Sequence, residues 1–375
     1  MDSSTLGQLL FGILFLVGGA DWLVRGASRL AATFGISPVI IGLTFVAYGT
    51  SAPELTVSVM ASLRGQPDIA VANVVGSNVL NILLILGITT VISPLVVAQR
   101  FVRREVPVLI GVSAMFYAVA SNGVISPVEG GVLLAGMAAY TIAALRSSRR
   151  EPAEVSEEYA REFGDAAKPG AKRYGSFVAA GACASGLILL VLGARWLVTA
   201  ATTIATAIGM SEAVIGLTVI ALGTSLPEVA TSVLAALRRE RDIAVGNVVG
   251  SNIFNLLGIG GFSALLSSDG LSVAPSIVAF DIPVMIAVAI ACLPILFTGH
   301  RIDRWEGFLL LGYYVAYTAY LVLDATGHDL LPAFSGTMLL FVLPLTGLTL
   351  AIVTVRAAVE RRGRSTGRRR WSRER

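Results

Sequence analysis

Apolar residues in this chain occur in repeated runs of about 20, which is the length that a helix needs to cross the hydrocarbon core of a bilayer. Short polar or charged stretches separate these runs. The pattern predicts an all-α integral membrane protein with eleven spans. We expect the spans at residues 7–31, 37–63, 70–94, 105–121, 127–146, 175–203, 211–237, 244–266, 274–298, 305–324 and 331–356.

Composition agrees with this pattern. The chain is 55% hydrophobic and 14% charged, whereas soluble domains are about 25% charged, and its mean hydropathy is +0.78. The net charge of +4 comes mainly from loops and the tail, so it reports on topology and does not indicate nucleic acid. No basic segment precedes the first apolar run, which therefore resembles a retained helix more than a cleaved signal. Cys183 and Cys292 stand alone within apolar runs, which is typical of helix packing.

The chain contains an internal repeat. Gly-Thr-Ser-Ala-Pro-Glu at 49–54 recurs as Gly-Thr-Ser-Leu-Pro-Glu at 223–228, which is 174 residues later. The same offset aligns residues 20–87 with residues 194–261, and more than half of the aligned positions are identical. A duplicated apolar segment that a proline interrupts and that carries a carboxylate points to a binding site where two repeats meet in a membrane.

Basic residues indicate the orientation of the spans. If the N-terminus lies outside the cell, the loops near 121–127, 204–212, 267–274 and 324–330 are outside, and they contain no Lys or Arg. The Arg-rich loops and tail then lie in the cytoplasm, as the positive-inside rule requires, with Arg64 as the clear exception. Five spans precede the central linker, so the two repeats enter the membrane from opposite sides and form an inverted repeat.

These boundaries predict five parts. They are a first five-helix repeat at 1–146 with its motif segment at about 37–94, a cytoplasmic linker at 147–174, a second five-helix repeat at 175–324 with its motif segment at about 211–266, an extra transmembrane helix at 325–356 and a basic cytoplasmic tail at 357–375. The protein is therefore expected in the cell membrane, with ten core helices and an eleventh C-terminal helix.

The repeated segment concentrates oxygen atoms. In a helix, Thr50, Ser51 and Glu54 lie on one side. Pro53 has no N–H, so it leaves the carbonyl of Gly49 without its usual helical donor. A freed carbonyl is tolerated at membrane depth where protein or a cavity supplies a partner. Hydroxyls, carbonyls and a carboxylate are ligands for Na⁺ or Ca²⁺, whereas zinc and copper prefer nitrogen and sulfur.

The span that follows each copy carries a polar stripe at a spacing of four residues. The stripe comprises Asn73, Ser77 and Asn81 in the first half and Asn247, Ser251 and Asn255 in the second. These side chains can supply further oxygen ligands, or they can join helices by hydrogen bonds. For the two glutamates, the alternative is a protonated structural carboxyl. A carboxylate at the helix centre costs about 2.5–3.5 kcal/mol on insertion scales, which favours a functional role for Glu54 and Glu228.

Other charges within the spans have simpler interpretations. Asp21 and Arg25 on the first span, and Arg195 on the sixth, are expected to form internal pairs or to extend toward the membrane surface. Glu-Val-Pro at 105–107 and Asp-Ile-Pro at 281–283 look like acidic helix N-termini, where a carboxylate complements the helix dipole.

The duplicated Gly-Thr-Ser-x-Pro-Glu and Gly-Ser-Asn-x-x-Asn segments resemble the α-repeats of the sodium/calcium exchanger family, part of the calcium/cation antiporter superfamily. The resemblance covers both repeats and ten spans, but not the eleventh. It implies that spans 2, 3, 7 and 8 surround the site and that spans 1 and 6 slide across this core. The implied ion ligands are the carbonyls of Ala47 and Ala221 and the side chains of Thr50, Ser51, Glu54, Ser77, Asn81, Thr224, Ser225, Glu228, Ser251 and Asn255.

One position departs from the family pattern. Many of these exchangers carry Asp where this chain has Asn255, so only Glu54 and Glu228 bring charge to the expected site. Two carboxylates neutralise one Ca²⁺, and they can also face two or three Na⁺ with help from neutral oxygens. The missing third carboxylate predicts exchange that does not require K⁺.

The sequence therefore predicts a secondary transporter and not an enzyme. The expected function is antiport of Na⁺ and Ca²⁺ by alternating access, with these ions and the lipid bilayer as partners and without a cofactor. An H⁺/Ca²⁺ antiporter that uses Glu54 and Glu228 as proton sites is the nearest alternative. An intramembrane hydrolase is a remote one, because no His lies near the motifs. The sequence leaves the oligomeric state open.

Overall fold

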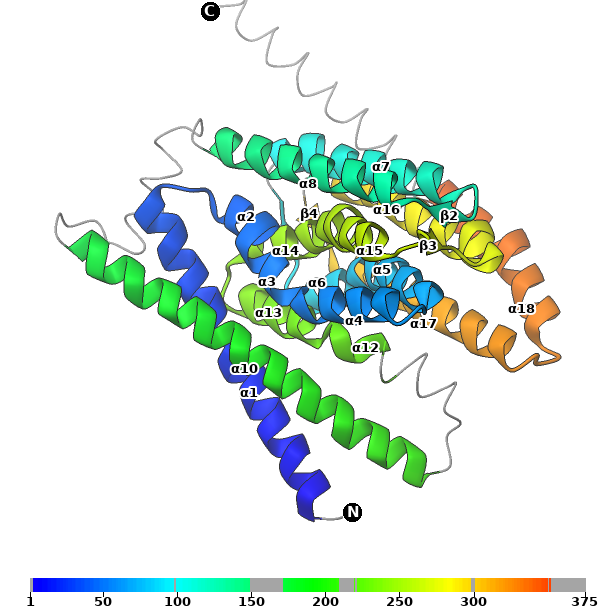
Figure 1. Ribbon diagram of the computed structural model, residues 1–375, viewed down its shortest axis with the longest axis horizontal. Coiled ribbons are helices and arrows are strands. Elements are labelled where there is room, and N and C mark those ends of the chain that lie inside the picture. The colour runs from blue at the N-terminus through cyan, green and yellow to red at the C-terminus, as the bar shows by residue number, and fades with distance from the viewer. Residues whose placement is uncertain are drawn as a thin grey trace, which may run out of the picture.

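Helices make up nearly all of the computed structural model, which describes residues 3–97, 99–148, 171–208, 219, 221–297, 301–349 and 351 (Figure 1). The first half contains α1 (Ser3–Phe34), α2 (Pro38–Ile41), η1 (Gly42–Val46), α3 (Ala47–Thr50), α4 (Ala52–Leu63), α5 (Pro67–Leu80), η2 (Asn81–Leu86), α6 (Gly87–Ile92), β1 (Leu95–Val96), α7 (Gln99–Ala120), β2 (Val124–Ile125) and α8 (Pro127–Ser148). Segments named η are π-helical turns.

The second half repeats this order. It contains α10 (Ala171–Ala207), α12 (Ala221–Thr224), α13 (Leu226–Leu237), α14 (Arg241–Phe254), η4 (Asn255–Ile259), α15 (Gly260–Leu266), β3 (Leu271–Ser272), η5 (Ile277–Asp281), α16 (Ile282–Phe297), β4 (Arg301–Ile302), α17 (Arg304–Ala325), α18 (Leu331–Thr337) and η6 (Met338–Val342). Most of the predicted linker, the start of the seventh predicted span and the predicted tail lie outside the described residues.

Within the described residues, seven helices are long and apolar enough to cross a membrane, and three shorter apolar helices accompany them. The shorter helices, Pro38–Thr50, Leu226–Leu237 and Ile277–Leu293, fall on predicted spans that are interrupted or partly outside the described residues. The fourth predicted span corresponds to α7, which begins several residues earlier than expected. The prediction of an all-α membrane protein with two inverted five-helix repeats and an extra helix is confirmed.

Four very short strands pair in a way that follows the symmetry of the two repeats. β1 pairs antiparallel with β4, and β2 pairs antiparallel with β3. Each pair joins a loop of one repeat to a loop of the other. The β1 and β4 loops were both predicted on the cytoplasmic side, and the β2 and β3 loops were both predicted outside. The structure therefore brings together the loops that the predicted topology places on one side of the membrane.

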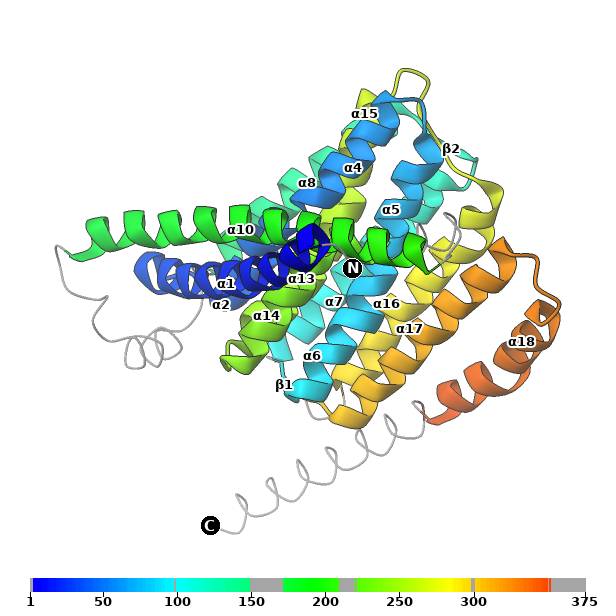
Figure 2. The same ribbon diagram turned by 90° about the horizontal axis from the view of Figure 1, so that it is seen from below.

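The helices form a central bundle and a crossing pair. The continuous helical stretches Pro67–Ile92 and Arg241–Leu266 are the most buried of the long spans, so they form the centre of the bundle. α1 and α10 pack against each other and cross at a shallow angle (Figure 1), and in Figure 2 both run across the direction of the bundle helices. The two halves thus contribute equivalent helices both to the centre and to the crossing pair.

The prediction that Glu105 and Asp281 cap helix N-termini was wrong. Glu105 lies six residues inside α7, and Asp281 lies in a helical stretch that continues into α16. Each carboxylate instead accepts a hydrogen bond from a tyrosine on another helix. The hydroxyl of Tyr140 lies 3.0 Å from Glu105 Oε2, and that of Tyr317 lies 2.7 Å from Asp281 Oδ1. Proline is tolerated inside both helices because packed neighbours in a membrane protein support an interrupted backbone.

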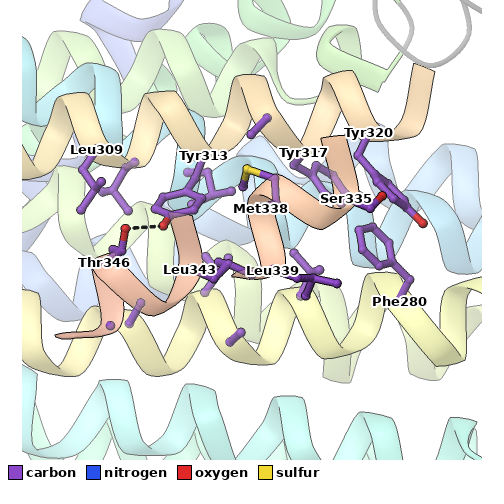
Figure 3. Close-up of a pocket in the computed structure, with 18 of the residues that line it drawn as sticks. Phe280, Leu309, Tyr313, Tyr317, Tyr320, Ser335, Met338, Leu339, Leu343 and Thr346 are labelled. Atoms are coloured by element: carbon purple, nitrogen blue, oxygen red, sulfur yellow. Dashed lines mark hydrogen bonds between the residues drawn. The ribbon is translucent and has the colours of Figure 1, made fainter. Parts of the chain in front are cut away.

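The eleventh span stands away from the bundle. Between this span and helices α16 and α17 lies a cavity of about 500 Å³ with an almost wholly apolar lining (Figure 3). A hydrogen bond of 2.6 Å from the hydroxyl of Tyr313 to Thr346 crosses beside this cavity. Because Na⁺ and Ca²⁺ need oxygen ligands, this apolar cavity is not suited to these ions, and no residue of the repeated motifs lines it.

Candidate ion-binding site

The two motif segments break their helices at equivalent positions. Ser51 lies between α3 and α4 with φ −80° and ψ 12°, and Ser225 lies between α12 and α13 with φ −88° and ψ 6°. Pro53 and Pro227 occupy the first turns of the helices that follow. Since Pro53 has no N–H, it cannot donate to the carbonyl of Gly49. The break that the sequence predicted is therefore present in both repeats.

Hydrogen bonds across the repeats connect the two breaks. Ser51 Oγ donates to Glu228 Oε1 at 2.8 Å, and Ser225 Oγ donates to Glu54 Oε1 at 2.8 Å. Both glutamates are only 1% exposed. The reciprocal pair of contacts is what a pseudo-two-fold axis between inverted repeats requires. Each glutamate keeps its second oxygen, Oε2, without a hydrogen-bond partner among the described residues.

A second ring of polar side chains supports the breaks. Asn73 donates to Ser58 Oγ at 2.9 Å, and its repeat equivalent Asn247 donates to Ser232 Oγ at 2.9 Å. Thr50 Oγ1 in turn donates to Asn247 Oδ1 at 3.1 Å. Ser58 and Ser232 were not among the residues predicted for the site. Each of them lies four residues after the glutamate of its repeat, on the same helix face, so the repeat itself carried the signal.

The polar stripe also reaches the centre of the bundle. Asn81 and Asn255 are the first residues of the π-helical segments η2 and η4, a geometry that is frequent at functional sites. Asn81 donates to Asn252 Oδ1 at 2.9 Å. The Oδ1 atoms of Asn81 and Asn255 and the hydroxyl of Ser251 are buried and have no partner among the described residues. Ser77, the equivalent of Ser251, is 5% exposed.

The remaining predicted ligands lie on the short helices before the breaks. The carbonyl of Ala47 accepts hydrogen bonds from the N–H of Ser51 at 3.1 Å and from Thr50 Oγ1 at 3.3 Å. To bind an ion as well, this carbonyl would have to use its free lone-pair direction or lose the threonine contact. Ala221 and Thr224 begin and end the equivalent helix α12. All predicted ligands therefore lie on the broken spans or on the spans that follow them.

Glycine allows the two repeats to approach closely at this site. A Cβ atom at Gly250 would lie 2.3 Å from the carbonyl oxygen of Leu43, so a larger residue there would push α14 away from η1. Gly250 opens the Gly-Ser-Asn-x-x-Asn motif. The second copy of the motif thus needs its glycine for contact between repeats, whereas a Cβ atom at the equivalent Gly76 of the first copy would meet no atom within 4 Å.

The donors at the site are hard oxygens. Among the described residues, no group of three or more His, Cys, Asp or Glu side chains is placed to hold a metal ion. The site has two carboxylates and several neutral hydroxyl and amide oxygens. This set fits an alkali or alkaline-earth cation better than zinc or copper. When both glutamates are ionised, two negative charges inside a membrane protein require compensation, which bound cations can supply.

A fold of inverted repeats with paired carboxylates at the junction defines a class of membrane cation transporters. The sequence profile described as "Sodium/calcium exchanger protein" matches residues 4–146 and 178–323. The chain therefore belongs to the sodium/calcium exchanger family, and it is a multi-pass cation antiporter.

Two curated relatives and one solved structure illustrate the similarity. The sodium/calcium exchanger MaX1 of Methanosarcina acetivorans is 34% identical over 341 residues, covering 82% of this chain and 96% of that protein. The inner membrane protein YrbG of Escherichia coli is 38% identical over 283 residues, covering 75% and 85%. A structure of the sodium-calcium exchanger NCX_Mj soaked with zero Na⁺ and Ca²⁺ superposes with a TM-score of 0.73 at 30% identity, covering 86% and 100%.

Proposed function

We propose that this antiporter exchanges Na⁺ for Ca²⁺ by alternating access, and that the two ions compete for the site around Glu54 and Glu228. The observation that carries the proposal is the reciprocal contact of Ser51 and Ser225 with these carboxylates, which leaves one buried oxygen of each glutamate without a protein partner among the described residues. The names of MaX1 and NCX_Mj, both sodium/calcium exchangers, support the choice of ions.

The proposed ligand set extends beyond the two glutamates. The carboxylates provide the charge that balances one Ca²⁺. Hydroxyls and amides of both repeats, together with the carbonyls of Ala47 and Ala221, complete the oxygen shell. The proposed side-chain ligands are Thr50, Ser51, Glu54, Ser77, Asn81, Thr224, Ser225, Glu228, Ser251 and Asn255.

The negative charge of the proposed site explains why one ion is transported only in exchange for another. Moving an empty site with two negative charges through a low-dielectric interior is costly, whereas a site occupied by one Ca²⁺ or by Na⁺ ions is neutral or nearly so. The carrier therefore changes sides readily only when it is loaded. Because Na⁺ and Ca²⁺ use overlapping oxygen ligands, the arrival of one ion favours release of the other.

The proposed orientation places the N-terminus outside and the linker 147–174 and the C-terminal tail in the cytoplasm. Its support is the distribution of Arg and Lys. The pairing of β1 with β4 and of β2 with β3 fits the alternation of the loops between two sides but would be the same in the opposite orientation, so the basic residues carry this part of the proposal.

Flux measurements in proteoliposomes test the proposed function. Purified protein is reconstituted, and uptake of labelled Ca²⁺ is followed under an outward Na⁺ gradient, an outward K⁺ gradient, an outward H⁺ gradient or no gradient. Na⁺ alone should drive uptake above the rate without a gradient. Uptake driven by H⁺ and not by Na⁺ would replace this proposal with the H⁺/Ca²⁺ alternative. Uptake in no arm would exclude Ca²⁺ as the substrate.

A further inference from the structure

The crossing helices α1 and α10 pack as one unit. A Cβ atom on Gly19 would lie 2.7 Å from the carbonyl oxygen of Gly186, and a Cβ on Gly186 would lie 2.7 Å from that of Gly19. Gly12 and Gly193, seven residues away on each helix, meet in the same way. Small residues let the two backbones approach closely along this seam. Any displacement relative to the bundle therefore carries both helices together.

This unit sits on the bundle asymmetrically. The repeat alignment equates α1 with α10 and α4 with α13. α1 packs extensively along α13, whereas α10 makes at most marginal contact with α4. In a transporter built from inverted repeats, exchanging the conformations of the two repeats generates the opposite-facing arrangement. The structure thus represents one of two arrangements, and in the other α10 packs along α4.

An ion pair connects α1 with α13. The guanidinium of Arg238, at the end of α13, binds the carboxylate of Asp21 on α1. Arg25, one turn further along α1, binds the same carboxylate, with its Nε 2.9 Å from Asp21 Oδ2. The side chains of Asp21 and Arg238 are 23% and 33% exposed. The contact is therefore shielded in part from solvent and is stronger than a fully exposed pair.

The equivalent positions in the other repeat carry a different charge pattern. Asp21 aligns with Arg195, and Arg238 aligns with Arg64. In the described part of the chain neither Arg195 nor Arg64 forms an ion pair. Exchanging the repeats would separate Asp21 from Arg238 and would bring the two arginines toward each other. The arrangement seen here therefore contains an attraction between opposite charges, whereas the opposite arrangement would contain a repulsion between two positive charges.

We propose that Asp21 and Arg238 form a latch that favours the arrangement seen here, and that Arg195 and Arg64 disfavour the opposite one. This inference rests on alternating access as part of the proposed function. In the proposed orientation Arg238 lies at the cytoplasmic end of α13, so the latch closes the cytoplasmic side and the carrier rests facing outward. Arg64, which departs from the positive-inside pattern, acquires a role in setting this preference.

Distances between spin labels can follow the two arrangements. Phe34 and Leu237 are the repeat equivalents of Ile208 and Leu63, and these four residues are 59–72% exposed. Spin labels are attached to two introduced cysteines, either at 34 and 237 or at 63 and 208. The background is the full chain in which Cys183 and Cys292 have been replaced. Double electron–electron resonance is recorded in lipid nanodiscs at fixed Na⁺. If the repeats exchange conformations, the two pairs should exchange their distance distributions.

Four variants test the latch. Asp21→Asn and Arg238→Gln should each increase the ratio of the second population to the first by about two- to fivefold, the range expected for loss of a partly exposed ion pair. The double exchange Asp21→Arg with Arg238→Asp should restore the original ratio. Arg195→Asp should shift the ratio in the same direction as Asp21→Asn, because it replaces a repulsion with an attraction to Arg64. Arg29→Gln, a charge loss elsewhere on α1, is the matched control and should leave the ratio unchanged.

Unchanged ratios in Asp21→Asn, Arg238→Gln and Arg195→Asp would overturn the latch, as would an equal shift in Arg29→Gln. These readings do not depend on which ion drives transport. If proteoliposomes show no Na⁺-driven Ca²⁺ uptake but the populations shift as described, the latch stands and the proposed ion coupling falls. If exchange is normal but Asp21→Asn, Arg238→Gln and Arg195→Asp all leave the ratio unchanged, the ion coupling stands and the latch falls.

Discussion

Each of the two buried glutamates has one oxygen held by a serine of the opposite repeat. Ser51 holds Glu228, and Ser225 holds Glu54. A hydroxyl donor orients a carboxylate without neutralising it, so the negative charge remains available to a cation. At the scale of single residues, the charge of the glutamates should matter more for transport than their shape.

Replacing either carboxylate with its neutral isostere tests this charge. Glu54→Gln or Glu228→Gln removes one of two charges and should abolish Na⁺-driven Ca²⁺ uptake while the protein still inserts and purifies normally. Asp269→Asn, a loss of the same charge on an exposed loop residue, serves as the control and should transport normally. Near-normal uptake by either glutamine variant at wild-type expression would remove these residues from the proposed site.

Asn255 offers the complementary test, because its amide can lend an oxygen to a cation but cannot carry charge. The wild type should exchange Na⁺ for Ca²⁺ without K⁺. Asn255→Asp should keep transport but alter ion selectivity, and its uptake should fall more steeply as pH is lowered, since protons can compete with the ions for the added carboxyl. Uptake is measured against pH with and without K⁺.

Asn122→Asp, the same change in an exposed loop, is the control for Asn255→Asp. Strict K⁺ dependence of the wild type would contradict the expectation. Identical pH profiles for the wild type and Asn255→Asp would show that position 255 does not face the ions.

At the scale of helices, similar carboxylate–tyrosine contacts join neighbouring elements in both repeats. Glu105 on α7 meets Tyr140 on α8, and Asp281 before α16 meets Tyr317 on α17. Each donor lies on the next long helix, 35 or 36 residues further along the chain. These contacts connect α7 with α8 and the η5–α16 stretch with α17, so each half uses a buried or half-buried carboxylate to join two of its later helices.

Removing one hydroxyl from this system should reduce stability. Tyr317→Phe keeps the ring that stacks on Phe280 but deprives Asp281 of a hydrogen bond, which should lower the free energy of unfolding by about 1–3 kcal/mol. Tyr117→Phe, at a tyrosine that is 39% exposed on α7, is the matched control. Unfolding is followed by titration with a denaturing detergent in mixed micelles. Equal stability of the two variants would mean that the Tyr317 contact contributes no net stability.

At the scale of the whole molecule, two small strand pairs join the repeats at their ends. β1 meets β4 at one end of the molecule, and β2 meets β3 at the other. The loops at the first end contain Arg residues, whereas the loops at the second contain no Lys or Arg. A single cysteine introduced by Ala160→Cys should react with an impermeant reagent only from the cytoplasm, and one introduced by Asp269→Cys only from outside. Position 269 is preferable to Gly270, whose φ of 82° and close neighbours disfavour a side chain. Reaction of both cysteines from one side would contradict the proposed orientation.

Hydropathy and repetition along the chain were enough to predict the order of the spans, the inverted repeat and the breaks at Ser51 and Ser225. These features are local or periodic. Apolar runs of bilayer length must become helices because lipid cannot satisfy backbone polar groups, and a repeated proline interrupts each helix at a fixed place. The same reasoning predicted the two glutamates and their oxygen-rich surroundings, whose role as ion ligands stays a prediction.

Which residues meet could be seen only from the packed fold. Nothing in the motif reveals that Ser51 holds the glutamate of the other repeat, or that Asn247 binds Ser232. Glu105 and Asp281 were expected at helix ends, yet they face tyrosines inside the bundle. In a membrane protein, surfaces that face lipid and surfaces that face other helices are both apolar, so hydropathy does not distinguish them. Packing of small residues and a few buried hydrogen bonds fixes how the helices meet, and these contacts join residues far apart in the chain.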